Sequence, residues 1–174
     1  MKIAYAEVVE NERLYGDTYV MWCRSPELGN GAYPGQFLML RCSDDADLTP
    51  GPFPMKEGES APGRFPTWGG ESGYDYDPLL PRPMSYHRVR IGTQGAEWAI
   101  LYDVVGRGTA WLAKRRPGDR IFAWGPLGVG YKVGRTSRNL LLVGGGIGIA
   151  PLVWLADEAV AQGRNVTLVI GARS

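Results

Sequence analysis

The sequence has few of the side chains that build metal centres. Its 174 residues include two cysteines, Cys23 and Cys42, and a single histidine, His87. The two cysteines stand apart and lack the CxxC spacing of zinc or redox motifs. We therefore expect two reduced thiols in a protein core and no metal site, and we expect His87 to be structural rather than catalytic.

The sequence also lacks a long apolar run and an excess of either charge. It has 19 Lys and Arg against 18 Asp and Glu, so we do not expect nucleic acid or a membrane surface as its main partner. No run reaches the roughly 18 apolar residues that a membrane span needs. An acid also stands at position 7, where a signal peptide has its apolar core. We therefore expect a cytoplasmic protein.

Glycine and proline are abundant, with 25 and 13 residues. They separate short runs rich in Val, Ile, Tyr and Trp, a pattern typical of a closed or nearly closed antiparallel barrel. We expect one short helix at 109–116, with Thr109 as its N-cap, and a first turn near Asn11 and Gly16. The expected strands are 3–9, 17–24, the segment after Pro34-Gly35, 86–92, 97–105 and 119–124.

Residues 43–78 interrupt this pattern. The segment is crowded with Gly, Pro, Asp, Glu and Ser, with aromatic residues scattered through it. A loop this long inside a compact domain is unusual. It is either a surface insertion, which we favour, or a lid whose aromatic side chains pack over a site.

The spacing of apolar residues changes in the last part of the chain. Residues 140–143 and 166–170 are apolar strands, and 150–162 is a helix between them. The unit is the start of a doubly wound α/β domain, and because the sequence ends soon after it, we expect a fragment of a longer protein. The apolar helix face is expected to comprise Leu152, Leu155, Ala156, Ala159 and Val160.

A glycine cluster at 144–148 joins the first of these strands to the helix. Glycines allow the backbone to approach a pyrophosphate closely, and the start of the helix offers free N–H groups. The cluster is not a strict G-x-G-x-x-G, because Ile149 stands at the third glycine position. No acid follows the second strand, where Arg173 and Ser174 stand instead.

Two upstream segments suggest a ligand for this turn. Arg82 and Ser85 precede a strand, and an arginine fork with a hydroxyl suits a diphosphate. Tyr86 follows, and its ring suits stacking on a planar heterocycle. Gly108 and Thr109 open the short helix, where backbone N–H groups suit an anion. Together these segments predict a nucleotide-binding site.

The motifs, in this order, resemble the ferredoxin reductase-type flavoprotein family, and most closely the electron-transfer subunits of dihydroorotate dehydrogenase. They run from near the N-terminus to the last residue. The matching motifs are Pro34-Gly35-Gln36-Phe37, Arg82-Pro83-Met84-Ser85-Tyr86, Val105-Gly106-Arg107-Gly108-Thr109, Pro117-Gly118-Asp119, Gly125-Pro126-Leu127-Gly128, Gly144-Gly145-Gly146-Ile147-Gly148-Ile149-Ala150-Pro151 and Ile170-Gly171-Ala172-Arg173-Ser174.

The resemblance implies an antiparallel six-stranded Greek-key β-barrel that binds FAD, at 1–135, followed by the first β-α-β unit of an incomplete NAD-binding domain, at 136–174. It implies an oxidoreductase subunit that passes electrons between a nicotinamide nucleotide, FAD and a dihydroorotate dehydrogenase catalytic subunit in pyrimidine biosynthesis, with no catalytic side chain. The implied FAD-binding residues are Arg82, Pro83, Met84, Ser85, Tyr86, Leu101, Tyr102, Asp103, Gly108 and Thr109. The implied nicotinamide nucleotide-binding residues are Gly144, Gly145, Gly146, Ile147 and Gly148.

The chain departs from the family in three respects. Residues 43–78 lengthen one connection, and Asp103 stands where similar sequences often have a basic residue, which argues against a direct contact with a diphosphate. The family's [2Fe–2S] cluster needs four thiolates, so we expect it only in a full-length parent. Alternative interpretations are a hydrogenase or sulfide dehydrogenase electron-transfer subunit, or a non-catalytic flavin-binding module. The resemblance favours NADH over NADPH as the nicotinamide nucleotide. We expect NADH to reduce the flavin of this chain weakly or not at all.

Overall fold

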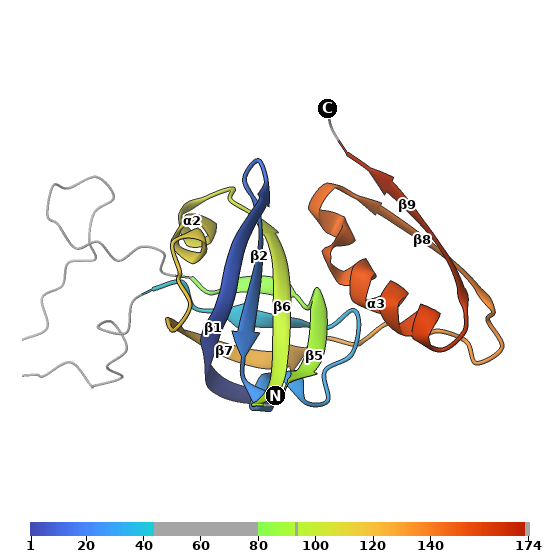
Figure 1. The fold of residues 1–174 in the computed structure, drawn as a ribbon, viewed down its shortest axis with the longest axis horizontal. Coiled ribbons are helices and arrows are strands. Elements are labelled where there is room, and N and C mark those ends of the chain that lie inside the picture. The colour runs from blue at the N-terminus through green and yellow to red at the C-terminus, as the bar shows by residue number, and fades with distance from the viewer. Residues whose placement is uncertain (44–79, 93, 173–174) are drawn as a thin grey trace, which may run out of the picture.

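The computed structural model describes residues 1–43, 80–92 and 94–172. The expected insertion therefore lies almost wholly outside the described residues. The described residues form a large antiparallel sheet and a small parallel sheet (Figure 1). The strands of the large sheet are β1 (Lys2–Tyr15), β2 (Thr18–Arg24), β3 (Phe37–Leu40), β4 (Arg82–Ser85), β5 (Arg88–Gly92), β6 (Gly95–Asp103) and β7 (Arg120–Leu127).

The large sheet has the strand order β4-β3-β7-β1-β2-β6-β5 and curls into a barrel. Its two outermost strands, β4 and β5, are separated in the chain only by Tyr86 and His87. The Tyr86 N–H donates to the Gln36 carbonyl beside β3, and the His87 N–H donates to the Ala99 carbonyl on β6. β4 and β5 are thus two halves of one strand, which joins the ends of the sheet. The predicted six-stranded barrel is confirmed, and β7, returning to pair with β1, makes the connection of Greek-key type.

The barrel interior is filled by alternate residues of its strands. Leu38 and Leu40 on β3 point inward and are fully buried, as are Trp98 and Ile100 on β6. Burying one such side chain contributes about 1.5–3 kcal/mol to folding. Cys23 and Cys42 belong to the same core and are free thiols. Alternate residues of these strands are therefore apolar because they fill a single continuous core.

The first hairpin differs from the sequence prediction. β1 continues to Tyr15, and the turn lies at Gly16, whose φ of 53° suits glycine. Asn11 is inside the strand, so a turn at this position is wrong. Its side-chain amide donates to the carbonyls of Leu112 and Arg115, at 2.9 and 3.0 Å. The polar side chain is used to bind the end of a helix, not to form a turn.

That helix, α2 (Arg107–Ala113), begins two residues earlier than predicted. Gly106 is the N-cap, and the prediction of Thr109 as the cap is wrong. Thr109 lies in the first turn, where its hydroxyl oxygen accepts hydrogen bonds from the N–H groups of Val105 and Gly106, at 3.0 and 3.2 Å. Thr109 thus stabilises the start of the helix from within.

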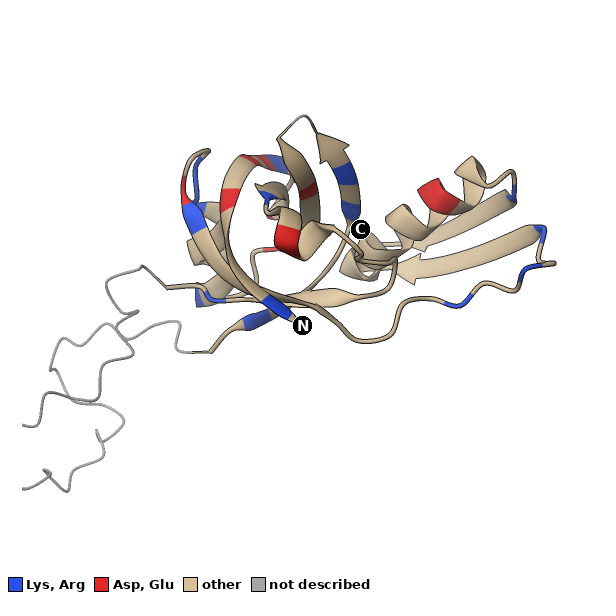
Figure 2. Cartoon of the chain, turned by 90° about the horizontal axis from the view of Figure 1, so that it is seen from below, with Lys and Arg blue, Asp and Glu red and all other residues tan. Residues whose placement is uncertain are grey.

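The outer wall of the barrel carries charges of both signs (Figure 2). The best-connected group is Glu97, which binds Arg24 at 3.0 Å and Arg90 at 2.7 Å, while Arg90 also lies 4.0 Å from the centre of the Trp22 ring. Burial raises the pKa of the Glu97 carboxyl, but hydrogen bonds from the two arginines outweigh it and hold the pKa below 4.5. The network ties β2, β5 and β6 together.

The small sheet belongs to a β-α-β unit, as predicted: β8 (Asn139–Gly145), α3 (Ala150–Ala161) and β9 (Asn165–Gly171), with β8 and β9 parallel. The predicted helix face is wrong in part. Val160 is 60% exposed, and Trp154, absent from the prediction, is buried. α3 lies between the barrel and the β8-β9 sheet, so it buries residues on two sides (Figure 1).

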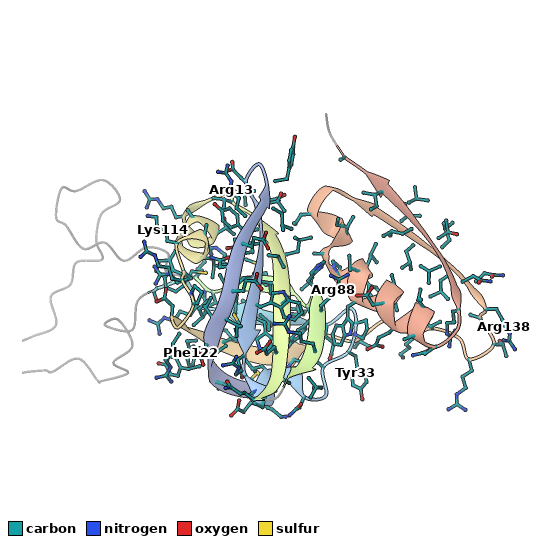
Figure 3. The ribbon with its side chains drawn as sticks, in the orientation of Figure 1. Arg13, Tyr33, Arg88, Lys114, Phe122 and Arg138 are labelled. Carbon is teal, nitrogen blue, oxygen red and sulfur yellow. The ribbon has the colours of Figure 1, made fainter. Side chains whose placement is uncertain are left out.

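Consecutive residues at the β4–β5 junction contact α3. The Tyr86 and Trp154 rings lie 6.0 Å apart in an edge-to-face arrangement. The Arg88 Nε donates to the Asp157 carboxylate at 2.7 Å, and Figure 3 shows Arg88 between β5 and α3. The position where the barrel closes is therefore also the position where the β-α-β unit packs against it.

Candidate functional site

A cavity of about 380 Å³ opens between the barrel wall and the start of the β-α-β unit. Residues from β4, β6, the segment before α2 and the glycine turn line it. The described lining residues are Pro83, Met84, Ser85, Leu101, Tyr102, Asp103, Val105, Thr109, Ile147, Gly148, Ala150 and Pro151. The structure thus brings together most of the site residues that the sequence motifs predict.

β4 contributes the first wall of the cavity. Ser85 pairs with Phe37 and Pro83 pairs with Met39, on the outward face of β3 and β4. Met84 packs against the barrel core from the opposite face. Met84 and Ser85 both line the cavity, so β4 contributes an apolar side chain and a hydroxyl to it.

The expectation that the Tyr86 ring stacks on a heterocycle is wrong. The side chain is fully buried in the barrel core, and its hydroxyl donates to the Leu28 carbonyl at 2.8 Å, on helix α1 (Pro26–Gly29). The ring also contacts the rings of Trp98 and Trp154 edge-on. Burial raises the pKa of the Tyr86 hydroxyl far above 10. The aromatic residue therefore anchors the barrel.

β6 contributes the second wall through its last three residues. Leu101 faces outward, while the Tyr102 ring is buried, stacked at 5.7 Å on Tyr19. The Asp103 carboxylate accepts a hydrogen bond from the Thr18 hydroxyl at 2.6 Å. Asp103 is the only charged side chain among the described residues that line the cavity. The negative charge is therefore a fixed feature of this wall.

Arg82 and Gly108, far apart in the sequence, lie against each other beside the cavity. A Cβ atom added to Gly108 would lie 2.7 Å from the Arg82 Nε. The Arg82 guanidinium also donates to the Leu80 carbonyl at 2.9 Å. Gly108 is therefore required by the close approach of the arginine, which sits at the start of α2. Asp103 lines the cavity, whereas Arg82 is not among its described lining residues.

The glycine turn forms the third wall. Ile147 and Gly148 line the cavity, whereas Gly144, Gly145 and Gly146 are not among its described lining residues. A Cβ atom on Gly144 would lie 3.0 Å from the side chains of Ile149 and Leu152, so this glycine permits the close packing of β8 on α3. Gly146 has a φ of 51°, which turns the chain between them.

Three lining residues, Val105, Ala150 and Pro151, were not among the predicted site residues. Each stands inside a motif that the sequence displays, two or three residues after a predicted site residue. The signal was therefore present in the motifs. The sequence does not show which positions of a motif face the cavity and which face the core.

His87 lies beside the cavity and binds one of its lining residues. The Nδ1 atom is 2.9 Å from the Ala150 carbonyl. Because a carbonyl only accepts hydrogen bonds, the proton is assigned to Nδ1. Burial lowers the pKa of the His87 ring below 6.5, and this effect outweighs the Ala150 bond, which raises it. A neutral His87 therefore positions the first turn of α3.

The described residues contain neither a membrane-spanning helix nor a metal cluster. No helix there is both long and apolar enough to cross a membrane. Across the same ranges, no three or more His, Cys, Asp or Glu side chains gather in a way that could hold a metal ion.

No protein-family model matches the chain, but curated proteins do. It is 33% identical over 172 residues to the dihydroorotate dehydrogenase B (NAD(+)) electron transfer subunit of Desulforamulus reducens, covering 99% of this chain and 53% of that protein. It is 31% identical to the protein of the same name from Bacillus velezensis, covering 100% of this chain and 56% of that protein. The chain spans about half the length of these relatives.

Solved structures share the fold. An NADH-dependent reduced ferredoxin–NADP oxidoreductase, studied for flavin-based electron bifurcation, matches with a TM-score of 0.70 and 28% identity, covering 98% of this chain and 49% of that chain. Phthalate dioxygenase reductase matches with a TM-score of 0.61 and 16% identity, covering 99% and 44%, and shows the fold alone. With its barrel and glycine turn, the chain shares the fold of ferredoxin reductase-type proteins, and its sequence is similar to these electron transfer subunits over about half of their length.

Proposed function

We propose that this chain binds FAD and serves as an electron-transfer subunit, passing electrons between a nicotinamide nucleotide and a dihydroorotate dehydrogenase catalytic subunit in pyrimidine biosynthesis. The observation that carries the proposal is the cavity, which gathers residues of three separate family motifs and of the end of β6 at one place. The curated relatives carry the name of this electron-transfer subunit. The proposal extends to this chain what those names state of the relatives.

The residues of the cavity fit a flavin nucleotide. Its volume of about 380 Å³ lies within the range of about 300–1,000 Å³ that is common for small-molecule sites. Its lining is largely apolar, and the hydroxyl of Ser85 and the carboxylate of Asp103 are among its polar groups. A ring system needs the apolar walls, and a hydroxylated chain needs the polar groups.

The diphosphate of the same ligand needs a cation, which Arg82 supplies. Its guanidinium is held against Gly108, where the absent side chain leaves room for the arginine. Arginine offers a planar fork of donors that matches phosphate oxygens. We therefore assign the diphosphate to Arg82 and Gly108, and the flavin and its hydroxylated chain to the walls formed by β4 and β6.

When bound, FAD would supply the redox chemistry, accepting a hydride and donating electrons singly. The chain's own residues bind and orient the ligand. Met84 and Leu101 give apolar contact, Ser85 a hydroxyl, and Ile147 and Gly148 close the cavity from the β-α-β unit. None of these residues needs to transfer a proton, in line with the absence of a predicted catalytic side chain.

The nicotinamide nucleotide is assigned to the glycine turn, residues 144–148. It follows β8 at the carboxyl end of a parallel strand, where ligands bind in open α/β sheets. We assign residues 1–135 to the FAD-binding domain and 136–174 to the nucleotide-binding unit. A [2Fe–2S] cluster uses four cysteine thiolates, and this chain supplies two cysteines, so the cluster is assigned to a longer parent.

A cytoplasmic location is part of the proposal. The two cysteines, Cys23 and Cys42, are buried as free thiols, and burial raises the pKa of the Cys42 thiol to about 11. Free buried cysteines are typical of reducing compartments. The two buried thiols therefore support a cytoplasmic location.

The proposal is tested by FAD binding to the purified chain and to two glycine variants. The unmodified chain is expected to bind one FAD, seen as flavin absorbance that is released on denaturation. Gly108→Ala is expected to weaken FAD binding about tenfold, or about 1.4 kcal/mol, because its Cβ displaces Arg82. Alanine at a helical position does not by itself destabilise the helix.

Gly106→Ala is the matched control. A Cβ at Gly106 meets nothing within 4 Å, and its φ of −178° is extended backbone open to any residue. This variant is expected to bind FAD as the unmodified chain does. A colourless chain that takes up no FAD would contradict the proposal, and equal binding by both variants would contradict the role of Arg82.

A further inference from the structure

We propose that Asp103 is a specificity-determining residue of the cavity: its carboxylate accepts a hydroxyl group of the flavin's polyol chain and disfavours the negatively charged, reduced form of the flavin. The inference rests on the proposed FAD binding and deepens it. It concerns the one charged side chain among the described residues that line the cavity.

The structure fixes the carboxylate in place. Asp103 ends β6 and pairs with Thr18, the first residue of β2. The Thr18 hydroxyl donates to Oδ1 of Asp103 at 2.6 Å, and the next backbone N–H, of Val104, donates to the Asp17 carbonyl at 2.9 Å. One carboxylate oxygen is therefore bound by the hairpin. An ionised carboxylate has about four acceptor sites, so it retains capacity for a ligand hydroxyl.

The charges around the site are separated. No Lys, Arg or His side chain is among the described residues that line the cavity, and Asp103 is the one acid there. Arg82 flanks the site beside Gly108. A carboxylate repels phosphate oxygens and accepts hydrogen bonds from hydroxyl groups. Asp103 therefore directs the uncharged polyol chain of the ligand to the β6 wall and leaves the diphosphate to Arg82.

The same charge acts on the redox step. A flavin that takes up two electrons and one proton becomes an anion of one negative charge. A fixed carboxylate in a cavity with largely apolar walls raises the free energy of that anion more than it would in water. It leaves the neutral oxidised ring almost unaffected. Asp103 therefore lowers the potential at which the flavin is reduced, and charge near the ring is a recognised way for a protein to tune a flavin.

The test uses three variants of the full chain loaded with FAD. Asp103→Asn keeps the shape and an acceptor oxygen but removes the charge. Thr18→Val keeps the charge but removes the hydroxyl that holds it. Asp17→Asn is the control, because it removes an exposed charge from the same hairpin, outside the cavity. The flavin midpoint potential is measured by anaerobic titration with dithionite against a reference dye, and FAD affinity by fluorescence.

The Asp103→Asn variant is expected to favour reduced over oxidised flavin about tenfold more than the unmodified chain. For a two-electron couple this is an upward shift of about 30 mV. Thr18→Val is expected to bind FAD about threefold more weakly without that shift, a loss of the order expected for one hydrogen bond. Asp17→Asn is expected to change neither quantity.

The outcomes separate the inference from the proposed function. If the unmodified chain binds no FAD, both are overturned. If it binds FAD and the potentials of Asp103→Asn and Asp17→Asn agree, the inference is overturned and FAD binding stands. A shift in Asp103→Asn alone supports the inference, because a merely structural role of Asp103 would change affinity or folding and not the potential selectively.

Discussion

The barrel and the β8-α3-β9 unit contain equally apolar strands but bury them differently. Leu38 on β3 is fully buried, whereas Leu141 on β8 is 68% exposed. Each barrel strand faces a common interior. β8 and β9 pair with each other, and α3 covers one of their faces. Apolar sequence therefore predicts a strand in both regions, but it does not predict how much of the strand is covered.

The comparison also shows where the two regions depend on each other. The core of the barrel is continuous, and its closing junction at residues 86–88 is the part that contacts α3. The β-α-β unit has fewer buried residues of its own, among them Leu142, Leu155 and Ala159. The barrel is therefore the stable platform, and the order of the β-α-β unit depends on its contact with that platform.

The largest expected effect comes from the same substitution made in both regions. Leu38→Ala is expected to lower the free energy of unfolding by about 3 kcal/mol, because it opens a cavity in the barrel core. Leu141→Ala is expected to change it by less than about 0.5 kcal/mol, because the side chain is exposed. Urea unfolding followed by tryptophan fluorescence measures both. Equal losses would show that β8 has a core comparable with that of the barrel.

A smaller, local effect is expected at the contact between the regions. Trp154→Ala removes the ring that meets Tyr86, and aromatic pairs contribute about 0.5–1.5 kcal/mol beyond their buried area. Hydrogen exchange is expected to become faster in β8 and β9 while the barrel amides stay protected. Val160→Ala, on the exposed side of the same helix, is the control and should leave exchange unchanged. Faster exchange throughout the barrel would contradict independent local opening.

The smallest expected effect is a pH dependence at the same contact. Burial lowers the pKa of His87 below 6.5 in the folded chain, so the unfolded chain takes up the proton first as the pH falls. The stabilising contribution is therefore complete above pH 6.5 and is lost as the pH falls from 6.5 through the lowered pKa. The free energy of unfolding, measured at pH values on both sides of 6.5, should show this decrease.

His87→Gln provides the comparison for that measurement. It removes the only histidine of the chain, and with it the group that titrates in this range. The decrease below pH 6.5 is expected to disappear in the variant. A decrease of the same size in both proteins would assign it to other groups and would exclude the burial of His87 as its source.

Much of the fold could be predicted because its elements carry strong local patterns. The alternation in β3 and β6 and the glycine between β8 and α3 are visible in the sequence, and the structure has these elements. The errors occur where a polar or apolar residue serves a distant partner. Asn11 suggests a turn, yet it binds the carbonyl groups at the end of α2. Val160 suggests a buried face, yet Trp154 fills that role.

The candidate site was predictable to a similar degree. Motif order identified Ser85, Asp103 and Gly148, and the structure brings them around one cavity. Motif order could not show that the Tyr86 ring turns into the core, because a strand has two faces and the sequence does not say which of them a ligand meets. It also gave no indication that Arg82 lies against Gly108.

The sequence by itself determined most of the strands, helices α2 and α3, the glycine turn and the resemblance to the family, because these depend on local spacing and on motifs read in order. The tertiary structure alone decided that residues 86–88 close the barrel and hold α3, and that Thr18 fixes the carboxylate of Asp103. The physical reason is that burial, hydrogen bonding and the field of a charge depend on neighbours in space. In a barrel, those neighbours come from strands that lie far apart in the chain.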